Sequence, residues 1–378
     1  MGSGLARRIL YVHHADVLGG AEWSLAELVR AVDRRRFEML AALPGDGPLS
    51  QVLTELHVAV LRVPMVRMRR TRNPLRLLRY WRCLRAAAET LAERVKSERI
   101  DLVHANSPQA ALVAGDLVRR RKVPLVVHWR DLVRRGLVWK DILRRCDRVV
   151  AVSKAVASCL DSPKVVVVAN GVDAERFGPG VSGDGVRREL GVPEGAPVVI
   201  MVAQWVPWKR HDVFLEAARR VGAGRPECHF VLAGEDHFGD HPELARRIRR
   251  AANEPALRGR LHILGQRADM PALMAASDVL VLPSEGEPFG RVLIEAMAAG
   301  RPVVAARSGG PEEIVTPDCG VLVDGPDAEA FAEAIEELLA DPASRRRMGE
   351  AGRQRVLQHY TARQMAAAME RLYEELLR

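Results

Sequence analysis

Short apolar runs recur along this chain and alternate with stretches in which apolar side chains repeat every three or four positions. Apolar runs bounded by turn residues predict buried strands, and the helical spacing predicts helices with one buried face. In the first half of the chain the predicted strands are residues 8–12, 37–43, 58–63, 100–104, 124–128, 148–152 and 165–168. Their alternation with helices predicts a parallel, doubly wound α/β sheet.

A glycine-rich interval, residues 177–185, separates this series from a second one and is the best linker candidate. Beyond it the predicted strands are residues 198–203, 230–233, 261–264, 279–282, 303–305 and 321–323, and the last predicted helix spans 361–377. A chain of 378 residues is long for one core. We therefore predict two doubly wound domains, residues 1–178 and 186–360, with ligands bound at strand ends in the cleft between them.

The stretch PSEGEPFGRVLIEAMAAG, residues 283–300, combines a strand end, a turn and the start of a helix. Pro288 disfavours helix at Glu287, which places this carboxylate in the turn. Helical spacing puts Glu295 about two turns into the helix. The amides that open the helix suit an anion, and we assign them to Phe289, Gly290 and Arg291. Alone, the two acids would be a helix cap and a solvated residue. The agreement of strand, turn and glycine favours a ligand with phosphate and hydroxyl groups.

The segment from Glu287 to Val304 resembles the E-x7-E signature of glycosyltransferase family 4, whose members have the GT-B fold and are retaining, nucleotide-sugar-dependent enzymes. The resemblance implies that Glu287 is catalytic and holds the donor sugar, whereas Glu295 holds the ribose hydroxyls. It implies a front-side substitution in which the departing β-phosphate takes the acceptor's proton. It further implies that the first domain faces the acceptor and that the last helix, residues 361–378, packs back on that domain.

Two candidates lie at strand ends in the first half of the chain. Gly19 and Gly20 follow the first strand and precede a helix, which by itself indicates only a βα turn. In the family this loop lies against the donor phosphates, and glycine permits that close approach. His128 ends the strand 124–128, where α/β ligand sites form, although a single histidine is more often a packed residue. Because it matches the family histidine near the reacting carbon, we assign it a catalytic role.

The second domain carries candidates for binding the diphosphate. Lys209 matches the family lysine, and the alternative is a solvated loop lysine. Gln204 stands where the family usually has arginine, and a glutamine offers a hydrogen bond to phosphate without a charge. We name Arg210 and Arg291 as the residues that could replace this charge.

Two turn residues complete the predicted donor site. Gly234 and Arg267 follow the strands 230–233 and 261–264. Turn residues at the end of a strand do not by themselves indicate a binding site. The resemblance implies that Gly234 approaches the diphosphate and that Arg267 flanks the nucleobase. The residues do not fix the base or the sugar, and we favour a UDP-sugar over a GDP-sugar as the co-substrate.

No cofactor or metal is predicted besides that co-substrate. The chain has no Asp-x-Asp, the motif with which metal-dependent GT-A glycosyltransferases hold a divalent ion. Its five cysteines are scattered, without a C-x-x-C pair, which favours a reducing compartment over a disulfide framework. We find no signal-peptide pattern and no apolar run of transmembrane length, so we expect a cytoplasmic protein.

Positive charge is concentrated in two segments. The formal charge is +9, yet residues 62–99 carry twelve Lys/Arg against three Glu, and residues 119–148 carry eleven against three Asp. The basic character therefore belongs to the first half of the chain. Nucleic acid is not the expected partner, because no recognised binding fold accompanies the charge.

The basic segment 62–99 contains a predicted helix that begins at Asn73. Its apolar stripe, which includes Leu77, Leu78 and Trp81, is expected to pack largely on the sheet, with arginines on the opposite face. A basic helical face is usually only solvated. Together with two upstream methionines, however, the segment also resembles a patch that binds an anionic membrane from the cytoplasmic side.

We thus predict a metal-independent transfer from a nucleotide-sugar to the hydroxyl of a sugar or lipid-linked acceptor. Within the same fold, a sugar-phosphate synthase is an alternative, and a phosphorylase is disfavoured by the short chain. From another class, the alternative is a non-catalytic membrane or nucleic-acid adaptor on a decayed GT-B scaffold, supported only by Gln204.

Overall fold

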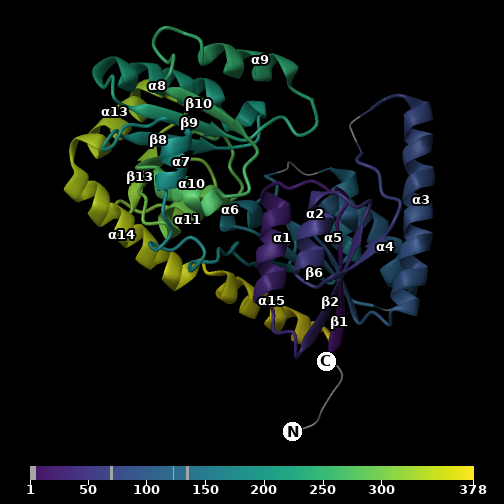
Figure 1. Cartoon of the computed structure of the whole chain (residues 1–378). Helices are drawn as coiled ribbons and strands as arrows, with labels where there is room; N and C mark the ends of the chain where they lie inside the picture. The colour runs from purple at the N-terminus through teal and green to yellow at the C-terminus, as the bar shows by residue number, and fades with distance from the viewer. Residues whose placement is uncertain (1–5, 69–70, 122, 133–135) are drawn as a thin grey trace. The chain divides into compact units, whose positions relative to one another are not determined.

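The computed structural model describes residues 6–68, 71–121, 123–132 and 136–378. The chain forms two compact units (Figure 1). Unit 1 contains Met1–Asn170 together with Ala362–Arg378, and unit 2 contains Gly171–Thr361. The division thus falls shortly before the glycine-rich interval 177–185. Each unit contains a parallel sheet with helices in its crossover connections, which confirms the predicted α/β class.

The sheet of unit 1 has the order β3-β2-β1-β4-β5-β6-β7. Its strands are β1 (Arg7–Val12), β2 (Phe37–Leu43), β3 (Ala59–Arg62), β4 (Leu102–Ala105), β5 (Leu125–Trp129), β6 (Arg148–Ala151) and β7 (Val165–Val167). The helices of this unit are α1 (Gly20–Ala31), α2 (Pro48–Glu55), α3 (Pro74–Ser97), α4 (Pro108–Arg121), α5 (Leu137–Arg145), α6 (Lys154–Ala157) and α15 (Ala362–Leu376).

Helix α15 belongs to the core of unit 1 although it comes from the far end of the sequence (Figure 1). Its apolar residues recur at helical spacing and line one buried face: Met365, Ala366, Met369, Leu372 and Tyr373. The Tyr373 ring meets the edge of Phe37 from β2, with ring centroids 5.8 Å apart. At the rim of this face Arg36 pairs with Glu370 and Glu374.

The sheet of unit 2 has the order β10-β9-β8-β11-β12-β13. Its strands are β8 (Val198–Val202), β9 (His229–Ala233), β10 (Leu261–Gly265), β11 (Val279–Leu282), β12 (Val303–Ala306) and β13 (Gly320–Val323). The helices are α7 (Asp184–Glu189), α8 (His211–Gly224), α9 (Pro242–Ala251), α10 (Met270–Ala276), α11 (Arg291–Ala298), α12 (Pro311–Ile314), α13 (Ala328–Ala340) and α14 (Pro342–His359), and a 3-10 turn spans Pro207–Lys209.

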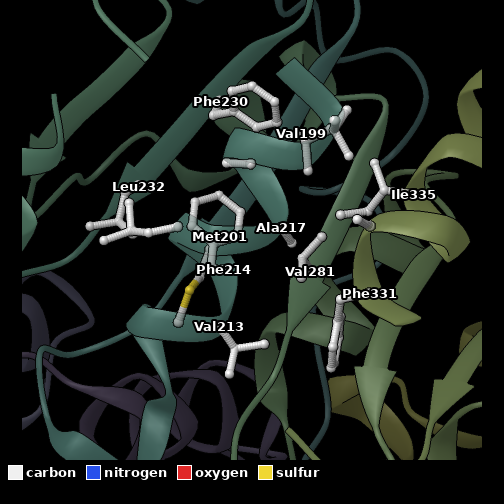
Figure 2. Close-up of a cluster of buried hydrophobic side chains, with 14 of the residues drawn as sticks. Val199, Met201, Val213, Phe214, Ala217, Phe230, Leu232, Val281, Phe331 and Ile335 are labelled. Atoms are coloured by element: carbon white, nitrogen blue, oxygen red, sulfur yellow. The ribbon is translucent and has the colours of Figure 1, made fainter. Parts of the chain in front are cut away.

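One face of the unit 2 sheet is covered by α8 and α13. Alternate residues of β8, Val199 and Met201, point to this face and pack with Phe214 of α8 and Phe331 of α13 (Figure 2). These side chains are buried, so the sheet and the two helices form one continuous apolar layer. The packing of this layer holds β8 in place, and with it the start of the loop that follows β8.

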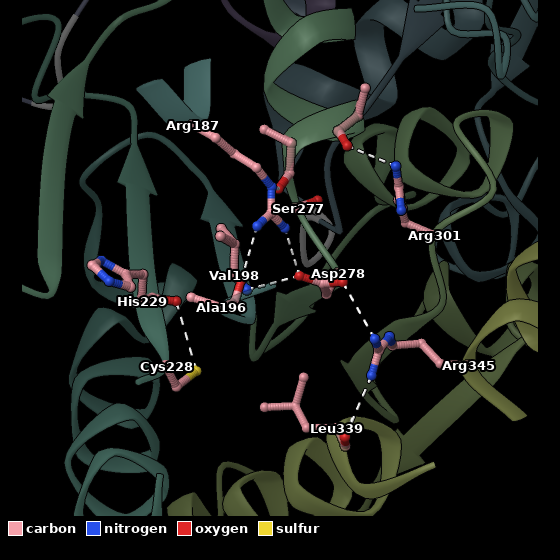
Figure 3. A network of polar contacts seen from close by, with 12 residues as sticks. Arg187, Ala196, Val198, Cys228, His229, Ser277, Asp278, Arg301, Leu339 and Arg345 are labelled. Atoms are coloured by element: carbon pink, nitrogen blue, oxygen red, sulfur yellow. Dashed lines mark hydrogen bonds and ion pairs between the residues drawn. The ribbon is translucent and has the colours of Figure 1, made fainter. Parts of the chain in front are cut away.

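The starts of β8 and β11 are tied together by Asp278 (Figure 3). Its carboxylate accepts the Val198 N–H at 2.9 Å and pairs with Arg187 at 2.8 Å and Arg345 at 3.4 Å. Arg345 also donates to the carbonyls that end α13, those of Leu338 and Leu339. This network holds the amino ends of β8 and β11 in register with each other. The loops that follow the two strands therefore start at fixed positions relative to one another.

Each sheet changes direction of winding between two neighbouring strands, β1 and β4 in unit 1, β8 and β11 in unit 2. At such a switch point the crossovers leave in opposite directions, and the loops after the two strands diverge to leave a crevice for ligands. The loops that border these two switch points are residues 13–19 and 106–107 in unit 1 and residues 203–210 and 283–290 in unit 2.

Helix α3 corrects one expectation. Its second half is anchored by Ala87, Leu91 and Val95, but its first half does not pack on the sheet. The exposed fraction is 76% for Leu75 and 56% for Trp81, and Leu77 and Leu78 are exposed as well. Helical spacing predicted an apolar stripe, and the stripe was expected to be buried. Spacing alone does not show which part of a long helix packs on the sheet, and here only the second half does so. Arg69 and Arg70, part of the same basic segment, lie outside the described residues.

Candidate active site

The two loops at the switch point of unit 2 meet through an ion pair. Lys209 ends the 3-10 turn after β8, and its Nζ lies 2.5 Å from Oε2 of Glu287 in the loop after β11. The Lys209 side chain is 14% exposed and that of Glu287 is 7% exposed. The Glu285 N–H donates to the Trp208 carbonyl at 2.7 Å, so the backbones of the two loops are joined too. The sequence motifs are 78 positions apart, and the neighbouring strands bring them together.

Helix α11 begins at Arg291, two residues later than expected. Gly290 is its N-cap with φ of 96°, a left-handed conformation that favours glycine. Phe289 is buried and lies edge-on to Tyr360, so it belongs to the packing beneath the loop. The opening amides are therefore those of Arg291 and the residues after it. Glu295 stands one turn into the helix, where Arg291 Nη2 donates to its Oε1 at 2.8 Å.

Arg291 has a further donor that is buried and unused. Its side chain is 10% exposed, and Nη1 has no hydrogen-bond partner in unit 2, all of which the structure describes. The hydroxyl of Ser284, buried in the same loop, has no partner either. Buried polar atoms are normally paired, so these two point to a polar ligand at the start of α11. Ser284 was missed by the sequence motifs, since an isolated serine after a strand carries no signal.

A third loop supports Glu287 from behind. The Gly310 N–H donates to the Glu287 carbonyl at 2.8 Å, and the Gly286 N–H donates to Ser308 Oγ at 2.6 Å. A Cβ on Gly310 would lie 2.3 Å from Cα of Phe289, so only glycine permits this approach. The Glu287 backbone is thereby held on both sides.

Two further donor-site candidates of unit 2, Gly234 and Arg267, differ in whether they are available to bind a ligand. Gly234 has φ of 126°, and a Cβ there would lie 2.0 Å from the Ala203 carbonyl oxygen, so only glycine permits this close approach of the two strand ends. Arg267 is committed: its guanidinium pairs with Glu189 at 2.6 Å and with Asp269 at 2.8 Å. These partners raise the pKa of Arg267 above its ordinary value.

Gln204 follows β8 and is half-buried. Arg210 and Arg291, the two arginines that could supply the positive charge usual at this position, differ in how far their charge is already balanced. Arg210 bonds Asp212 at 3.0 and 3.1 Å and Glu285 at 3.2 Å. Its charge is thus balanced by two carboxylates. Arg291 has one carboxylate, that of Glu295, and an unused N–H. Arg291 is therefore the better candidate.

In unit 1, Gly19 is the N-cap of α1, and Gly20 is its first residue. The Gly19 N–H donates to Oε2 of Glu22 at 2.9 Å, while Oε1 of the same carboxylate lies 2.5 Å from Nε2 of His13. Burial raises the pKa of Glu22, but His13 and the Gly19 amide outweigh it and hold the pKa at about 2. The glycine loop is therefore shaped around a buried carboxylate that stays ionised.

Arg130 connects the strand ends of unit 1. Its guanidinium donates to Asn106 Oδ1 at 2.8 Å, to Asn170 Oδ1 at 3.0 Å and to Ser24 Oγ at 3.2 Å. These partners follow β4, follow β7 and lie in α1. The sequence reasoning did not select Arg130 or its partners, because the contacts span many positions and no motif contains them.

His128 lies within this cluster and is 1% exposed. Its Nδ1 is 3.2 Å from Nη2 of Arg130, and its ring stacks on His104 with centroids 5.4 Å apart. Burial, with Arg130 and His104 beside it, lowers the pKa of His128 well below its ordinary value. The imidazole is therefore neutral at physiological pH. His104 in turn bonds the Tyr373 hydroxyl at 2.6 Å, which links this stack to α15.

Comparison with known proteins agrees with these motifs. The family model described as "Glycosyltransferase Family 4" matches residues 18–176, and "Glycosyl transferases group 1" matches residues 184–355. The D-inositol 3-phosphate glycosyltransferase of Kribbella flavida is 31% identical over 364 residues, covering 86% of this chain and 82% of the relative. The chain belongs to the GT-B glycosyltransferases of family 4.

Other relatives of this family 4 chain match over less of their length. A GDP-mannose-dependent monoacylated alpha-(1-6)-phosphatidylinositol monomannoside mannosyltransferase of Corynebacterium glutamicum is 34% identical over 196 residues, which is 50% of each protein. The chain thus spans about half of that relative. Among solved structures, Anabaena Alr3699/HepE in complex with UDP-glucose is similar with a TM-score of 0.84 and 25% identity, covering 97% of this chain and 99% of the other.

Across the described ranges, no three His, Cys, Asp or Glu side chains are grouped closely enough to hold a metal ion. None of the helices in those ranges combines the length and apolar character needed to cross a bilayer.

Proposed function

We propose that the protein transfers a sugar from a nucleotide diphosphate sugar to an acceptor hydroxyl with retention of configuration. The observation that carries this proposal is the Lys209–Glu287 ion pair beside the start of α11, in which the Glu287 carboxylate is buried and Lys209 is 14% exposed. An ammonium next to helix-opening amides suits a diphosphate, and the adjoining carboxylate suits sugar hydroxyls. Glu287 holds the sugar to be transferred, and Glu295, oriented by Arg291, holds the ribose.

The departing diphosphate gains negative charge as the glycosidic bond breaks. Lys209, the unused N–H of Arg291 and the first amides of α11 are fixed donors for that charge. Fixed donors need no reorganisation during the reaction, so they are effective in stabilising a transition state. In this mechanism the transfer runs without a metal, and the β-phosphate oxygen takes the proton of the attacking hydroxyl on the same face.

We favour a UDP-sugar over a GDP-sugar as donor. The support is the likeness to a structure that contains UDP-glucose. A relative matched over half its length is named as GDP-mannose-dependent, so both bases belong in the first assay.

For the acceptor we propose a lipid-linked or membrane-surface molecule reached by peripheral attachment to an anionic membrane. The first half of α3 exposes Leu75, Leu77, Leu78 and Trp81, which are flanked by exposed arginines 76, 79 and 82 of the helix and by Arg72 just before it. Apolar residues able to enter the headgroup region, surrounded by arginines, are typical of a helix that lies on anionic lipid. Each arginine near such a surface adds roughly 1 kcal/mol.

The donor assay tests the transferase. Purified protein is incubated with UDP- and GDP-sugars, and release of the nucleoside diphosphate is measured with and without candidate acceptors. These include anionic glycolipids and, after the Kribbella flavida relative's name, D-inositol 3-phosphate. We expect release from one donor class that increases with an acceptor. Binding to liposomes without release from any donor would instead favour the adaptor.

Flotation with liposomes tests the membrane step separately. The wild type should float with anionic vesicles, and less so in added salt, because the attraction is screened. Replacing Arg72, Arg76, Arg79 and Arg82 by Glu should abolish flotation. The matched control makes the same charge change on α9, at Arg246, Arg247, Arg249 and Arg250, which are also exposed. Equal loss in both variants would mean that total charge, not α3, is responsible.

A further inference from the structure

Trp208 has an exposed ring in the loop that carries Lys209. The indole is 40% exposed, and its ring centroid lies 4.2 Å from Nζ of Lys209. A single exposed apolar side chain is common on protein surfaces and needs no functional explanation. Here, however, the ring meets the ammonium itself, well within the distance of about 6 Å at which an aromatic face attracts a cation. The contact lies beside the Lys209–Glu287 ion pair and therefore concerns the candidate site.

The backbone that carries the indole is held in place. Trp208 is the middle residue of the 3-10 turn Pro207–Lys209, in which the Lys209 N–H donates to the Val206 carbonyl at 3.1 Å. The Trp208 carbonyl accepts the Glu285 N–H at 2.7 Å, which joins the turn to the loop after β11. The ring is thus attached to backbone that is fixed both by its own turn and by the neighbouring loop.

The donors of Lys209 show what a ring offers as a partner. An ammonium has three N–H donors, and Glu287 accepts one of them at 2.5 Å. Within unit 2, which the structure describes throughout, Nζ has no second acceptor. An aromatic face attracts the cation without being a hydrogen-bond acceptor and without a negative charge. The indole can therefore hold Lys209 in place while two N–H donors stay available for phosphate oxygens.

Arg210, the next residue, shows the contrasting arrangement. Its guanidinium is paired with two carboxylates, those of Asp212 and Glu285. Lys209 is paired with one carboxylate, and its other neighbour is a neutral ring. The ammonium thus gains a second contact without a second negative charge, which would repel a phosphate.

We propose that Trp208 is a positioning residue whose ring holds Lys209 Nζ where its two remaining N–H donors meet the diphosphate of the nucleotide-sugar. This inference rests on the proposed function, in which Lys209 binds the diphosphate and Glu287 the sugar. The sugar is attached to the terminal phosphate of that diphosphate. Because Lys209 lies beside Glu287, the effect of the ring should depend on Lys209 and on the terminal phosphate.

Titration calorimetry with UDP and UMP tests this dependence without any turnover. Trp208→Leu removes the ring but keeps an apolar side chain, and UDP should bind about 10-fold more weakly to this variant. UMP lacks the terminal phosphate and should bind within about 2-fold of the wild type. Trp208→Phe keeps an aromatic face and should bring UDP affinity back to within about 3-fold of the wild type. If GDP is the nucleotide that binds, GDP and GMP take the place of UDP and UMP.

A double-mutant cycle with Lys209→Met separates positioning from a general effect on the loop. In Lys209→Met the ring has no cation to hold, so the added Trp208→Leu should change UDP affinity by less than about 2-fold. Additive losses, or equal losses for UDP and UMP, would mean that the indole contacts the nucleotide or shapes the loop, and they overturn the inference. Trp208→Gln, which also lacks an aromatic face, replaces Trp208→Leu in both comparisons if that variant does not fold. A wild type that binds neither UDP nor GDP refutes the proposed donor, and the inference falls with it.

Discussion

Replacing Glu287 by Gln should separate the two tasks of the Lys209–Glu287 pair. The amide keeps the size of the side chain and can still accept a hydrogen bond from Lys209, but it removes the negative charge. Lys209, 14% exposed, then lacks its counter-ion in the unliganded protein. Fully buried pairs cost about 3–5 kcal/mol when one partner is removed. Because Lys209 keeps some solvent contact, we expect the free energy of unfolding to fall by roughly 2 kcal/mol.

The nucleotide should reverse this loss. In the wild type a bound diphosphate has to share Lys209 with Glu287, whereas in Glu287→Gln the ammonium is available. We expect UDP to bind Glu287→Gln about 5- to 10-fold more tightly, which is roughly 1–1.4 kcal/mol. Turnover should nevertheless fall about 30- to 1000-fold, since the charge-assisted contact to the transferred sugar is lost.

Calorimetry and kinetics measure these effects. The melting temperature is followed with increasing UDP, the UDP affinity is obtained by titration calorimetry, and release of UDP is timed at saturating donor. The control is Glu285→Gln in the same loop, a mostly exposed carboxylate that pairs with Arg210 and should change stability by less than about 1 kcal/mol. If Glu287→Gln binds UDP less tightly and still turns over within 3-fold of the wild type, the assignment of both residues is wrong.

Three other outcomes are expected. Gln204→Arg should be tolerated and tighten nucleotide binding, measured by titration calorimetry; a collapse of affinity would place Gln204 away from the diphosphate. Activity should survive EDTA in the release assay, and a loss restored by Mg²⁺ or Mn²⁺ would contradict the metal-independent mechanism. Burial lowers the pKa of His14 and His211 to about 4 and of His104 to about 3. Because the unfolded chain takes up these protons near pH 6.5 and the folded chain does not, stability should decrease from pH 7 to pH 4, by up to about 1.4 kcal/mol per pH unit for each histidine. A urea midpoint that stays constant over this range would contradict the burial.

Much of the fold could be predicted from apolar patterns. The strands β2 and β11 have the predicted bounds, and the others differ by one or two residues at one or both ends. This works because strands in a parallel sheet are buried on both faces and appear as continuous apolar runs. Helix starts were less predictable. The pattern of α11 includes Phe289, and only the left-handed backbone of Gly290 moves the first turn to Arg291.

Candidate site residues could be selected from the sequence where chemistry is concentrated in short motifs. Glu287 and Glu295 were selected from the E-x7-E motif and Lys209 from its match to the family lysine. The neighbouring strands β8 and β11 then bring Lys209 and Glu287 into contact. The Arg130 cluster was not predictable, because its members come from distant segments and are common polar residues. The exposure of α3 was missed for a related reason. Periodicity shows that a helix has an apolar face but not what covers it.

The position of α15 has a consequence for synthesis of the protein. Unit 2 is an insertion within unit 1, since the segments that form unit 1 flank it in the sequence. During translation unit 2 can fold as soon as its own residues have emerged, whereas the core of unit 1 must wait for Tyr373 and its neighbours to close one face of the sheet. The apolar surface that α15 will cover therefore remains open while the whole of unit 2 is made. This order of folding makes unit 1 the part that depends on protection from aggregation in the cell.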